Sequence, residues 1–437
     1  MTRRWINQCI DDHKHQRLEA IPGSTILPAR ILHIVNNASQ VVLQTPSDID
    51  LEYTALSHCW GSLQPATLTS NTLERFKSGV DTAELPQTFK DAILLSHTLG
   101  IHYLWIDSLC IVQDDPEDWR KESSKMHYVY NNSTITIAAS RAADSSKGFL
   151  GKRLERTYVP VPFRADEIYG QVLAYIIPEE TVATVHVYME DQPLSTRSWA
   201  LQERCMSRRT LHFTDSQIFF ECEQGFASED CYYRVPHLAK FCLGGHLKEP
   251  TREQWHDKWC EVVTRYSRRK LALVDDKLVA LAGLAAYFSS CYPRDAPSIL
   301  NNRYIAGLWL DDLVRYLCWA PDWSSPSGLR PQKYRAPTWP WASLDGAIEY
   351  GYISRMGSPF SELTVVQDAQ LDLEYPGNLF GEIVGGWISL GVTKVQPYLA
   401  PLGPYTDPVG GFNFTFQIGA VGFFLRPHWD SASHPYP

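Results

Sequence analysis

Several features that mark common protein classes are missing from this sequence. Its ten cysteines contain no CxxC pair, so their spacing predicts neither a zinc ribbon nor a dense disulfide framework. No apolar run reaches the roughly 18 residues that a membrane-spanning helix needs, and the N-terminus lacks the apolar segment of a signal peptide. Internal repeats, low-complexity tracts and a glycine-rich phosphate-binding motif are also absent. We therefore expect a soluble cytoplasmic protein whose cysteines are mostly buried and reduced.

Positively charged residues are fewer than negatively charged ones in this sequence. The chain has 40 Lys and Arg residues against 49 Asp and Glu residues, which gives a formal net charge of -9. Such a surface offers no general attraction to nucleic acid or to anionic membranes. We interpret two short basic segments, residues 204–209 and 265–270, as solvated or salt-bridged faces. Neither nucleic acid nor a membrane is expected as a partner.

What the chain does contain is enough apolar and aromatic material for more than one core. It has 437 residues, 44% of them hydrophobic, with 14 Trp, 22 Tyr and 17 Phe. A chain of this length is expected to form two or three domains. We predict a lead-in helix and hairpin over residues 1–50, an α/β domain over 51–225, and an α+β region over 226–437 packed on that domain. In the lead-in, His13 lies near Trp5 and Cys9, and packing is favoured over metal binding, so no metal site is expected.

The second segment alternates strands with helices. Short β-forming runs start at residues 53, 103 and 134, and the strand at 103 is predicted to extend to Cys110. The helices between them are predicted to begin near Pro86, ending at Gly100, and at Pro116, with Asp115 as N-cap. Alternation of this kind predicts a parallel, doubly wound sheet with right-handed crossovers.

Further elements are predicted on either side of this unit. The lead-in is predicted to hold a helix up to about residue 20, with Trp5, Cys9 and Ile10 on one face, and then strands at 27–35 and 40–44. A helix capped by Ser195 or Thr196 precedes a hairpin at 209–213 and 217–222. The last region is predicted to hold helices at 252–266, 275–288 and 304–319, an extended segment at 335–343, and strands at 380–390 and 412–425.

Asp107 is the first charge after the apolar run that starts at Tyr103, so we place it at the carboxyl end of a central strand. In open α/β sheets this edge is where ligands bind. A plain loop cap is the structural alternative for the same residue. The residues that follow the first strand reach the same edge, and these are Ser57, His58, Trp60 and Gly61.

These segments resemble the fungal heterokaryon incompatibility (HET) domain family. The matching stretches are YTALSHCWG at 53–61, LPQTFKDAI at 85–93, LGIHYLWIDSLCIVQ at 99–113, residues 118–130 and TRSWALQE at 196–203. With weaker later segments, the resemblance touches most of residues 5–350. It implies a role in non-self recognition and regulated cell death in filamentous fungi, with a homo-oligomer or a partner incompatibility protein. It also implies a TIR-like, flavodoxin-like parallel sheet flanked by helices.

The same resemblance suggests a chemistry. Some TIR-like domains cleave NAD at the nicotinamide–ribose bond with a glutamate four residues after a tryptophan, and Trp199 and Glu203 have this spacing. Ala200 stands where the usual TIR pattern has cysteine. A carboxylate would stabilise the oxocarbenium-like transition state. The structural alternative for Glu203 is a salt bridge to Arg197 or Arg204. NAD would be a substrate, and no cofactor is expected.

Other residues have roles that follow from this hypothesis. Asp107 would orient a ribose hydroxyl or fix Arg197. Arg197 would bind a pyrophosphate, or hold the helix start against the sheet. Trp60 would stack on nicotinamide or adenine, or belong to the core. A nucleophile formed by His58 with Cys59 or Cys110 is a further alternative, although buried cysteines are commonly inert. The predicted catalytic residues are Glu203 and Asp107, and the predicted substrate-binding residues are Ser57, His58, Trp60, Gly61, Arg197 and Trp199.

Three hypotheses make different structural predictions. An NAD-cleaving effector predicts Glu203 and Asp107 in one open cleft. A non-enzymatic signalling module that works by homotypic assembly predicts a closed or apolar site and exposed complementary surfaces. A metabolic enzyme that reuses the crevice predicts a well-formed pocket lined by His58, Cys110 or the C-terminal half, with Glu203 turned away.

Overall fold

The chain is described by a computed structural model. It describes residues 1–13, 15, 27–47, 50–61, 66–153, 158–165, 168–174, 189–230, 234–236, 251–292, 303–322, 330–350, 364–375, 378–392, 398–399, 415–418 and 421–424. Two compact units are present, one made of Met1–Gly357 with Gln370–Trp387, the other of Ser358–Ala369 with Ile388–Pro437. Among the described residues, none of the helices is both long and apolar enough to cross a membrane. The division into three segments stays a prediction.

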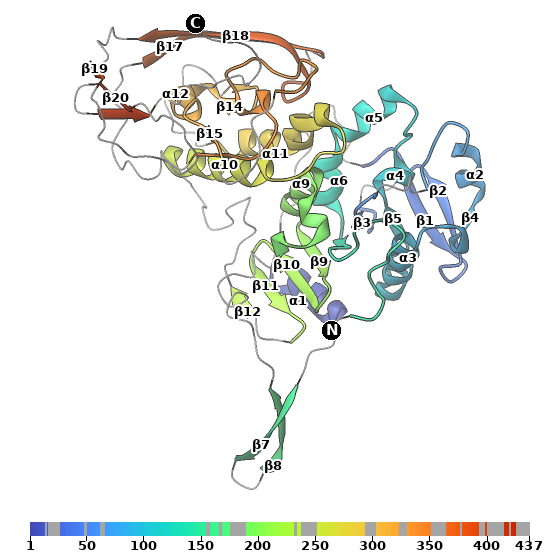
Figure 1. The fold of residues 1–437 in the computed structure, drawn as a ribbon. Helices are drawn as coiled ribbons and strands as arrows, with labels where there is room; N and C mark the ends of the chain where they lie inside the picture. Colours follow the sequence, from blue (N-terminus) through green and yellow to red (C-terminus); the bar gives the residue numbers. More distant parts are fainter. Residues whose placement is uncertain are drawn as a thin grey trace, which may run out of the picture. The chain divides into compact units, whose positions relative to one another are not determined.

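A ten-stranded mixed sheet organises the first unit (Figure 1). Its order is β12-β11-β10-β9-β6-β3-β5-β1-β2-β4. The strands are β1 (Ile31–Val35), β2 (Gln40–Gln44), β3 (Thr54–Ser57), β4 (Val80–Asp81), β5 (Tyr103–Trp105), β6 (Ile135–Ala138), β9 (Arg209–Phe213), β10 (Ile218–Cys222), β11 (Gly225–Ser228) and β12 (Arg234–Pro236). The contiguous strands β9, β6, β3 and β5 pair in parallel, and the other pairs are antiparallel. The predicted parallel unit is therefore confirmed for its three strands β3, β5 and β6, and β9, predicted only as part of a hairpin, extends it within a mixed sheet.

Helices separate the parallel strands. They are α2 (Leu73–Ser78), α3 (Gln87–Leu99), α4 (Asp107–Cys110), α5 (Pro116–Ser123), α6 (Met126–Asn132) and α9 (Ser198–Met206). The predicted C-terminal end of α3 and the predicted N-terminal end of α5 are confirmed. Gly100 adopts the left-handed conformation, and its backbone N–H donates to the carbonyl groups of Ser96 and His97 in the last turn of α3. Asp115 caps α5 by accepting from the backbone N–H groups of Glu117 and Asp118.

Two predicted element boundaries are wrong. The strand from Tyr103 does not extend to Cys110, because the chain turns into the single buried helical turn α4. Ser195 and Thr196 do not cap α9, since they lie in a 3-10 turn that ends before it. Arg197 is the N-cap residue and makes no side-chain cap. The first N–H of α9, from Ser198, instead donates to the carbonyl of Lys270 at 2.9 Å, a tertiary contact that local sequence does not predict.

The lead-in is partly as predicted. The strand pair β1 and β2 is confirmed. Helix α1 covers Thr2–Asp12, with Ile6 and Cys9 buried, whereas Ile10 is exposed. The predicted helical face was therefore offset. Residue 14 and residues 16–20 of that predicted helix lie outside the described residues.

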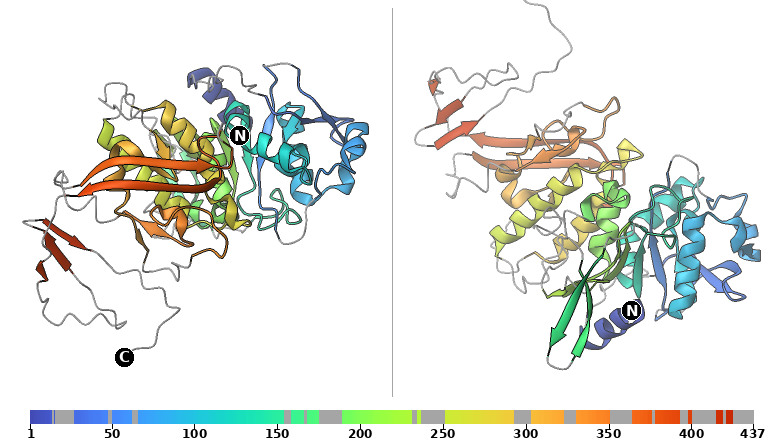
Figure 2. Two further views of the ribbon diagram at one scale, coloured as in Figure 1. Left: turned by 90° about the horizontal axis from the view of Figure 1, so that it is seen from above. Right: turned by 60° about the horizontal axis from the view of Figure 1, so that its bottom comes forward.

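The chain that follows the sheet forms helices and small hairpins. Helices α10 (Arg252–Ser267) and α11 (Val279–Ser290) confirm two predicted helices, and both lie beside α9 (Figure 2). The remaining described α-helix is α12 (Leu313–Tyr316). Outside the ten-stranded sheet, the hairpin of β7 (Val159–Ala165) and β8 (Ile168–Ala174) lies between β6 and β9 in the chain, and the later strands are β13 (Tyr304–Ile305), β14 (Leu308–Trp309), β15 (Ala320–Pro321), β16 (Ile348–Glu349), β17 (Thr364–Leu373), β18 (Ile383–Val392), β19 (Tyr398–Leu399), β20 (Thr415–Ile418) and β21 (Val421–Phe424).

The predicted helix over 304–319 is wrong in its first half. Residues 304–309 form the tight hairpin of β13 and β14, with positive φ at Ala306 and Gly307. A Cβ at Gly307 would lie 2.7 Å from Nε1 of Trp341. The carbonyl of Gly307 accepts from the indole N–H of Trp259 at 3.0 Å and of Trp341 at 3.2 Å. Packing against two tryptophans thus overrides helix propensity here.

Most of the cysteines that the structure describes are reduced, as predicted. Seven are thiols, namely Cys9, Cys59, Cys110, Cys222, Cys260, Cys291 and Cys318. Cys205 is disulfide-bonded. The prediction of reduced thiols is therefore wrong for Cys205.

Candidate functional site

The parallel strands define where a ligand site is expected. From β3 the chain crosses to β5 on one side, and then to β6 on the other side of β3. The strand order reverses at this point, so a crevice is expected outside the carboxyl ends of β3 and β6. Ser57 ends β3 and Ala138 ends β6.

Glu203 lies at this edge, on the buried face of α9. The hydroxyl of Ser57 donates to its carboxyl group, and the hydroxyl of Tyr130 is a second hydrogen-bonding partner. Its side chain is fully enclosed, with 1% of the residue exposed. Burial raises the pKa of Glu203 to about 7, while the nearby Arg197 opposes the shift and Asp107 adds to it. Glu203 therefore binds a proton near neutral pH.

Asp107 is positioned by the turn from β5 into α4. Its carboxylate accepts from the backbone N–H of Ser108 at 2.7 Å and from the indole N–H of Trp60 at 2.9 Å. Asp107 therefore caps the turn that follows β5, as the structural alternative predicted. The indole of Trp60 is half-buried and its N–H is used by Asp107.

His58 is a buried imidazole with unused polar atoms. Neither ring nitrogen has a hydrogen-bonding partner, and Nδ1 lies 3.8 Å from the carboxylate of Asp107. Phe89 packs edge-on against the ring. Burial lowers the pKa of His58 to about 4, against the attraction of Asp107, so the ring is neutral at physiological pH.

Arg197 and Gly61 have structural roles in this conformation. A guanidinium N–H of Arg197 donates to the carbonyl of His58, which holds the start of α9 against the loop after β3. This matches the second of the two roles predicted for Arg197. Gly61 has a φ of +81° and a Cβ there would lie 2.3 Å from that of Asp144, so glycine is required at this turn.

Trp199 does not join Glu203. Its indole N–H donates to Asp276 at 3.2 Å, in the turn before α11. One turn further along α9, the side chain of Gln202 accepts from the N–H of Gly283 at 2.8 Å. Although they are four residues apart on one helix, Trp199 therefore contacts the turn before α11, whereas Glu203 contacts the end of β3.

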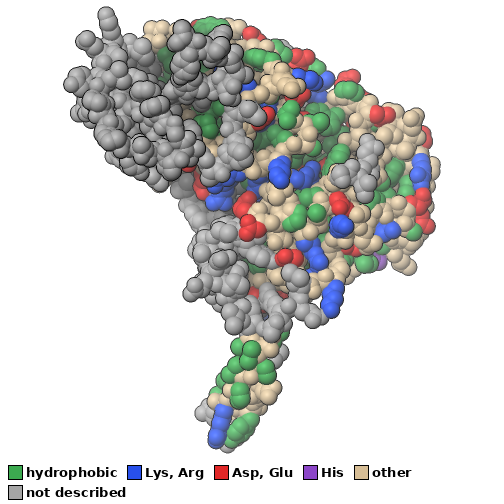
Figure 3. Space-filling view, viewed as in Figure 1, with side chains coloured by type: hydrophobic (Ala, Val, Ile, Leu, Met, Phe, Trp, Pro, Cys, Tyr) green, Lys and Arg blue, Asp and Glu red, His purple; other side chains and the backbone are tan. Residues whose placement is uncertain are grey.

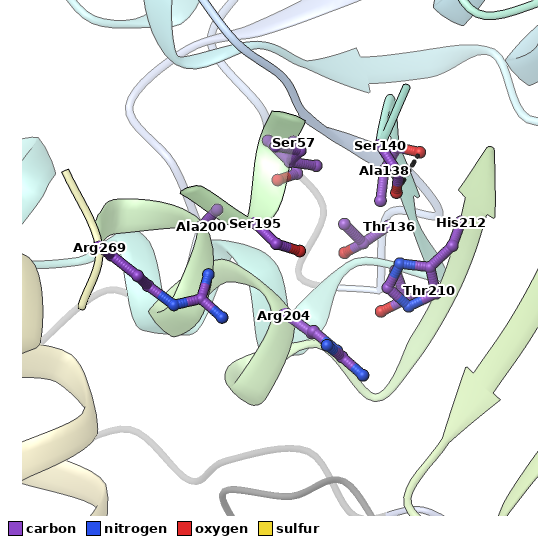
Figure 4. A pocket seen from close by; sticks show the side chains of 11 residues that line it. Ser57, Thr136, Ala138, Ser140, Ser195, Ala200, Arg204, Thr210, His212 and Arg269 are labelled. Atoms are coloured by element: carbon purple, nitrogen blue, oxygen red, sulfur yellow. Dashed lines mark hydrogen bonds between the residues drawn. The ribbon is translucent and has the colours of Figure 1, made fainter. Parts of the chain in front are cut away.

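A small cavity lies beside this cluster (Figure 4). Its volume is ≈ 10 Å³, about enough for one water molecule. Its lining includes Ser57 and further residues that the sequence analysis did not select, namely Thr136, Ala138, Ser140, Leu194, Ser195, Ala200, Arg204, Thr210, His212 and Arg269. No nucleotide fits a cavity of this size without movement.

Two arginines on this lining pair with carboxylates, one of them buried (Glu221) and one partly exposed (Glu190). Arg204 forms a bidentate pair with Glu221, at 2.8 and 3.1 Å, and His212 lies 2.8 Å from the same carboxylate. Arg204 and His212 hold the pKa of Glu221 well below its usual range, against the effect of burial. Arg269 pairs with Glu190 at 2.6 Å. A glutamate between Phe220 and Cys222 in a strand was the available sequence signal for this network.

Among the described residues, Glu203 and Asp107 do not line the predicted open cleft, because they are only 1% and 8% exposed. The charge of Asp107 contributes to the raised pKa of Glu203. The site is closed because α9 covers the strand ends.

The thiol alternative is also disfavoured by the geometry. Burial raises the pKa of Cys59 to about 11 and that of Cys110 to about 12, so both are protonated at neutral pH. The ring nitrogens of His58 bond to neither.

The family comparison covers the segment that contains this cluster. Residues 53–203 match the family described as heterokaryon incompatibility protein (HET). No curated protein and no solved structure gives a significant match to the chain. The matched segment holds all eight site residues predicted from the sequence, and its last residue is Glu203. The protein therefore carries a heterokaryon incompatibility (HET) domain over residues 53–203.

Proposed function

We propose that this protein is an effector of fungal non-self recognition and cell death, and that it cleaves NAD at the nicotinamide–ribose bond from a latent, closed state. The observation that carries the proposal is Glu203, a carboxyl group with a pKa of about 7 at the reversal of strand order. Ionisable groups with perturbed pKa values at such an edge are candidates for catalysis. The order β9-β6-β3-β5 is also that of a flavodoxin-like, TIR-like sheet.

The proposed chemistry needs one carboxylate. As the bond between ribose and nicotinamide breaks, nicotinamide leaves with the electron pair and positive charge develops on the ribose. The ionised Glu203 would stabilise that charge, and water would then add to the ribosyl carbon with release of a proton. Ser57 and Tyr130, which already contact this carboxyl group, would orient it. Asp107 would hold a ribose hydroxyl.

Opening of α9 is the step that the proposal requires. Three contacts tie this helix to the later part of the first unit, from Ser198 to Lys270, from Trp199 to Asp276 and from Gln202 to Gly283. When α9 moves, water reaches Glu203 and its pKa returns toward the ordinary range, so the carboxylate becomes ionised. Closure thus accounts for latency, and opening accounts for activation.

A second candidate function is a non-enzymatic module that signals by homotypic assembly. Closure of the site favours it, as does an unusual surface. The hairpin of β7 and β8 exposes apolar side chains on both strands (Figure 3), namely Val159, Val161, Phe163, Ile168, Tyr169 and Val172, each at least 44% exposed. Exposed apolar patches of this kind mark sites of protein association.

The deciding experiment measures nicotinamide release from NAD by the full-length chain at high protein concentration. The variant Asp276→Ala removes the acceptor of Trp199 and should loosen α9, so it should release nicotinamide faster than wild type. Adding Glu203→Gln should abolish that release, whereas Glu84→Gln, an exposed control carboxylate, should not affect it. Absence of release by wild type and by folded Asp276→Ala would refute NAD cleavage and favour the assembly module.

A further inference from the structure

Four side chains with metal-binding atoms meet where the N-terminal helix joins the sheet. Cys9 lies in the last turn of α1, His13 is its C-cap, and His15 follows two residues later. Cys222 is the last residue of β10 and lies 209 residues from His13 in the sequence. One ligand atom from each of the four lies within 4.8 Å of every other.

The spacing of these atoms suits a tetrahedral metal. The Sγ of Cys9 lies 3.1 Å from Nε2 of His15, and the Sγ of Cys222 lies 3.4 Å from Nδ1 of His13. Zinc binds sulfur at about 2.3 Å and imidazole nitrogen at about 2.0 Å, which places tetrahedral ligand atoms roughly 3.3–3.8 Å apart. Two thiolates and two imidazoles are also a common donor set of structural zinc sites.

The surroundings resemble those of a built metal site. Nδ1 of His15 lies 3.1 Å from the carboxylate of Glu223, which leaves Nε2 directed at the cluster. A carboxylate bound to the outer nitrogen is the usual partner of a metal-ligating histidine. Nε–H of Arg209 donates to the Sγ of Cys9 at 3.2 Å, and this positive charge favours the thiolate.

The cluster is enclosed and joins two elements that also pack together. Cys9 is 2% and Cys222 1% exposed, and the side chain of His15 is fully buried. Trp5 of α1 stacks on Phe220 of β10, with ring centroids 6.1 Å apart. Four protein ligands with no open position indicate a structural role, because a catalytic site keeps one position for water or substrate.

We propose that Cys9, His13, His15 and Cys222 bind one zinc ion that fastens α1 to β10. The metal would cross-link two segments that are distant in the sequence, so its binding free energy would contribute to folding of the first unit. The sequence favoured packing over metal binding for His13, because the fourth ligand lies far from the local CxxxHxH pattern.

The first test measures metal content. Full-length protein purified with zinc present should contain about one zinc ion per chain, as measured by inductively coupled plasma mass spectrometry. Cys222→Ser and His15→Gln should lose that zinc, whereas Cys260→Ser, a matched change of a buried thiol elsewhere, should retain it. Wild type with no bound zinc, or Cys222→Ser with zinc unchanged, would overturn the proposal.

Cobalt substitution tests the donor set independently of stability. Co²⁺ added to chelator-treated wild type should give the visible bands of tetrahedral cobalt and a thiolate-to-cobalt charge-transfer band. His13→Cys should keep the tetrahedral bands and strengthen charge transfer, because a third thiolate replaces an imidazole. An octahedral cobalt spectrum would contradict the assignment. So would a disulfide between Cys9 and Cys222 that forms although the protein is kept with zinc under reducing conditions.

Discussion

Two buried ionisable groups, one in the HET domain and one in the region that follows it, have pKa values brought to about 7 by burial. Glu203 lies among the hydroxyls of Ser57 and Tyr130 and the charges of Arg197 and Asp107. The ammonium of Lys277 donates to the carbonyl of Leu344 and lies 5.4 Å from the ring centroid of Trp341.

The difference teaches that a perturbed pKa is not evidence of function by itself. Burial is the largest cause of both pKa shifts, since it disfavours the charged form of each group. The ammonium group of Lys277 interacts with a backbone carbonyl and with the face of an aromatic ring, as expected for a structural residue of the core. Glu203 lies where the strand order reverses, next to a buried histidine whose nitrogens make no hydrogen bond. Location and neighbours distinguish the two cases.

The largest expected effect is the pH dependence of Lys277→Met. The folded pKa of Lys277 is about 7, against 10.5 for an ordinary lysine, so the unfolded state binds more protons between these pH values. Wild type should therefore gain about 1.4 kcal/mol per pH unit relative to the variant from pH 7 upward, roughly 5 kcal/mol in full. Urea unfolding of both proteins from pH 6 to 9.5 checks this. A stability difference that does not change with pH would show that the ammonium is not penalised by burial.

Trp259→Ala should destabilise the protein by about 3–5 kcal/mol, because it empties a large volume in the core. Trp259 is fully buried and packs edge-to-face on Phe288, Tyr304 and Trp309. The midpoint of urea unfolding measures the loss, with Leu94→Ala, at an exposed position, as control. A loss no larger than that of the control would mean that the aromatic core is not what stabilises this region.

Glu203→Gln should show a pH dependence opposite in sign to that of Lys277→Met. The folded pKa of Glu203 is about 7 against 4.5, so the folded state binds more protons between these values and wild type loses stability as pH rises. The burial cost is absent below pH 4.5 and complete above pH 7, where the variant should be more stable by roughly 3 kcal/mol. Unfolding measured from pH 4.5 to 8 tests this. A variant less stable than wild type at pH 8 would indicate an ionised, well-paired carboxylate.

The smallest expected effect is Thr251→Ala, about 1 kcal/mol of destabilisation. Thr251 and Gln254 form a capping box at the start of α10, in the same region as Lys277. The cost is small because water replaces the lost partner at this exposed helix end. Thermal unfolding with Thr251→Ser as the conservative control checks it, and equal losses in both variants would argue against the hydroxyl as the cause.

Local patterns predicted much of the fold but less of the site. Helix ends at Gly100 and Asp115 follow from residue-specific backbone preferences, so sequence could place them. The placement of Ser57 and Asp107 at one edge also follows from sequence, because parallel strands bring their carboxyl ends together, whereas Glu203, on α9, was selected only by its spacing from Trp199. Closure of that edge was not predictable, since it depends on α9 being held by Lys270 and Asp276, which are distant in sequence.

Sequence by itself determined the HET-domain segment, the strand and helix alternation, and the residues at the carboxyl ends of the strands. Hydrophobic periodicity and helix capping depend on residues close together in the sequence, so both can be identified without knowledge of the fold. Tertiary structure decided the burial of Glu203, the pairing of Arg204 with Glu221 and the meeting of Cys9 with Cys222. Each depends on contacts between segments far apart in the chain, where packing and desolvation set both the geometry and the charge.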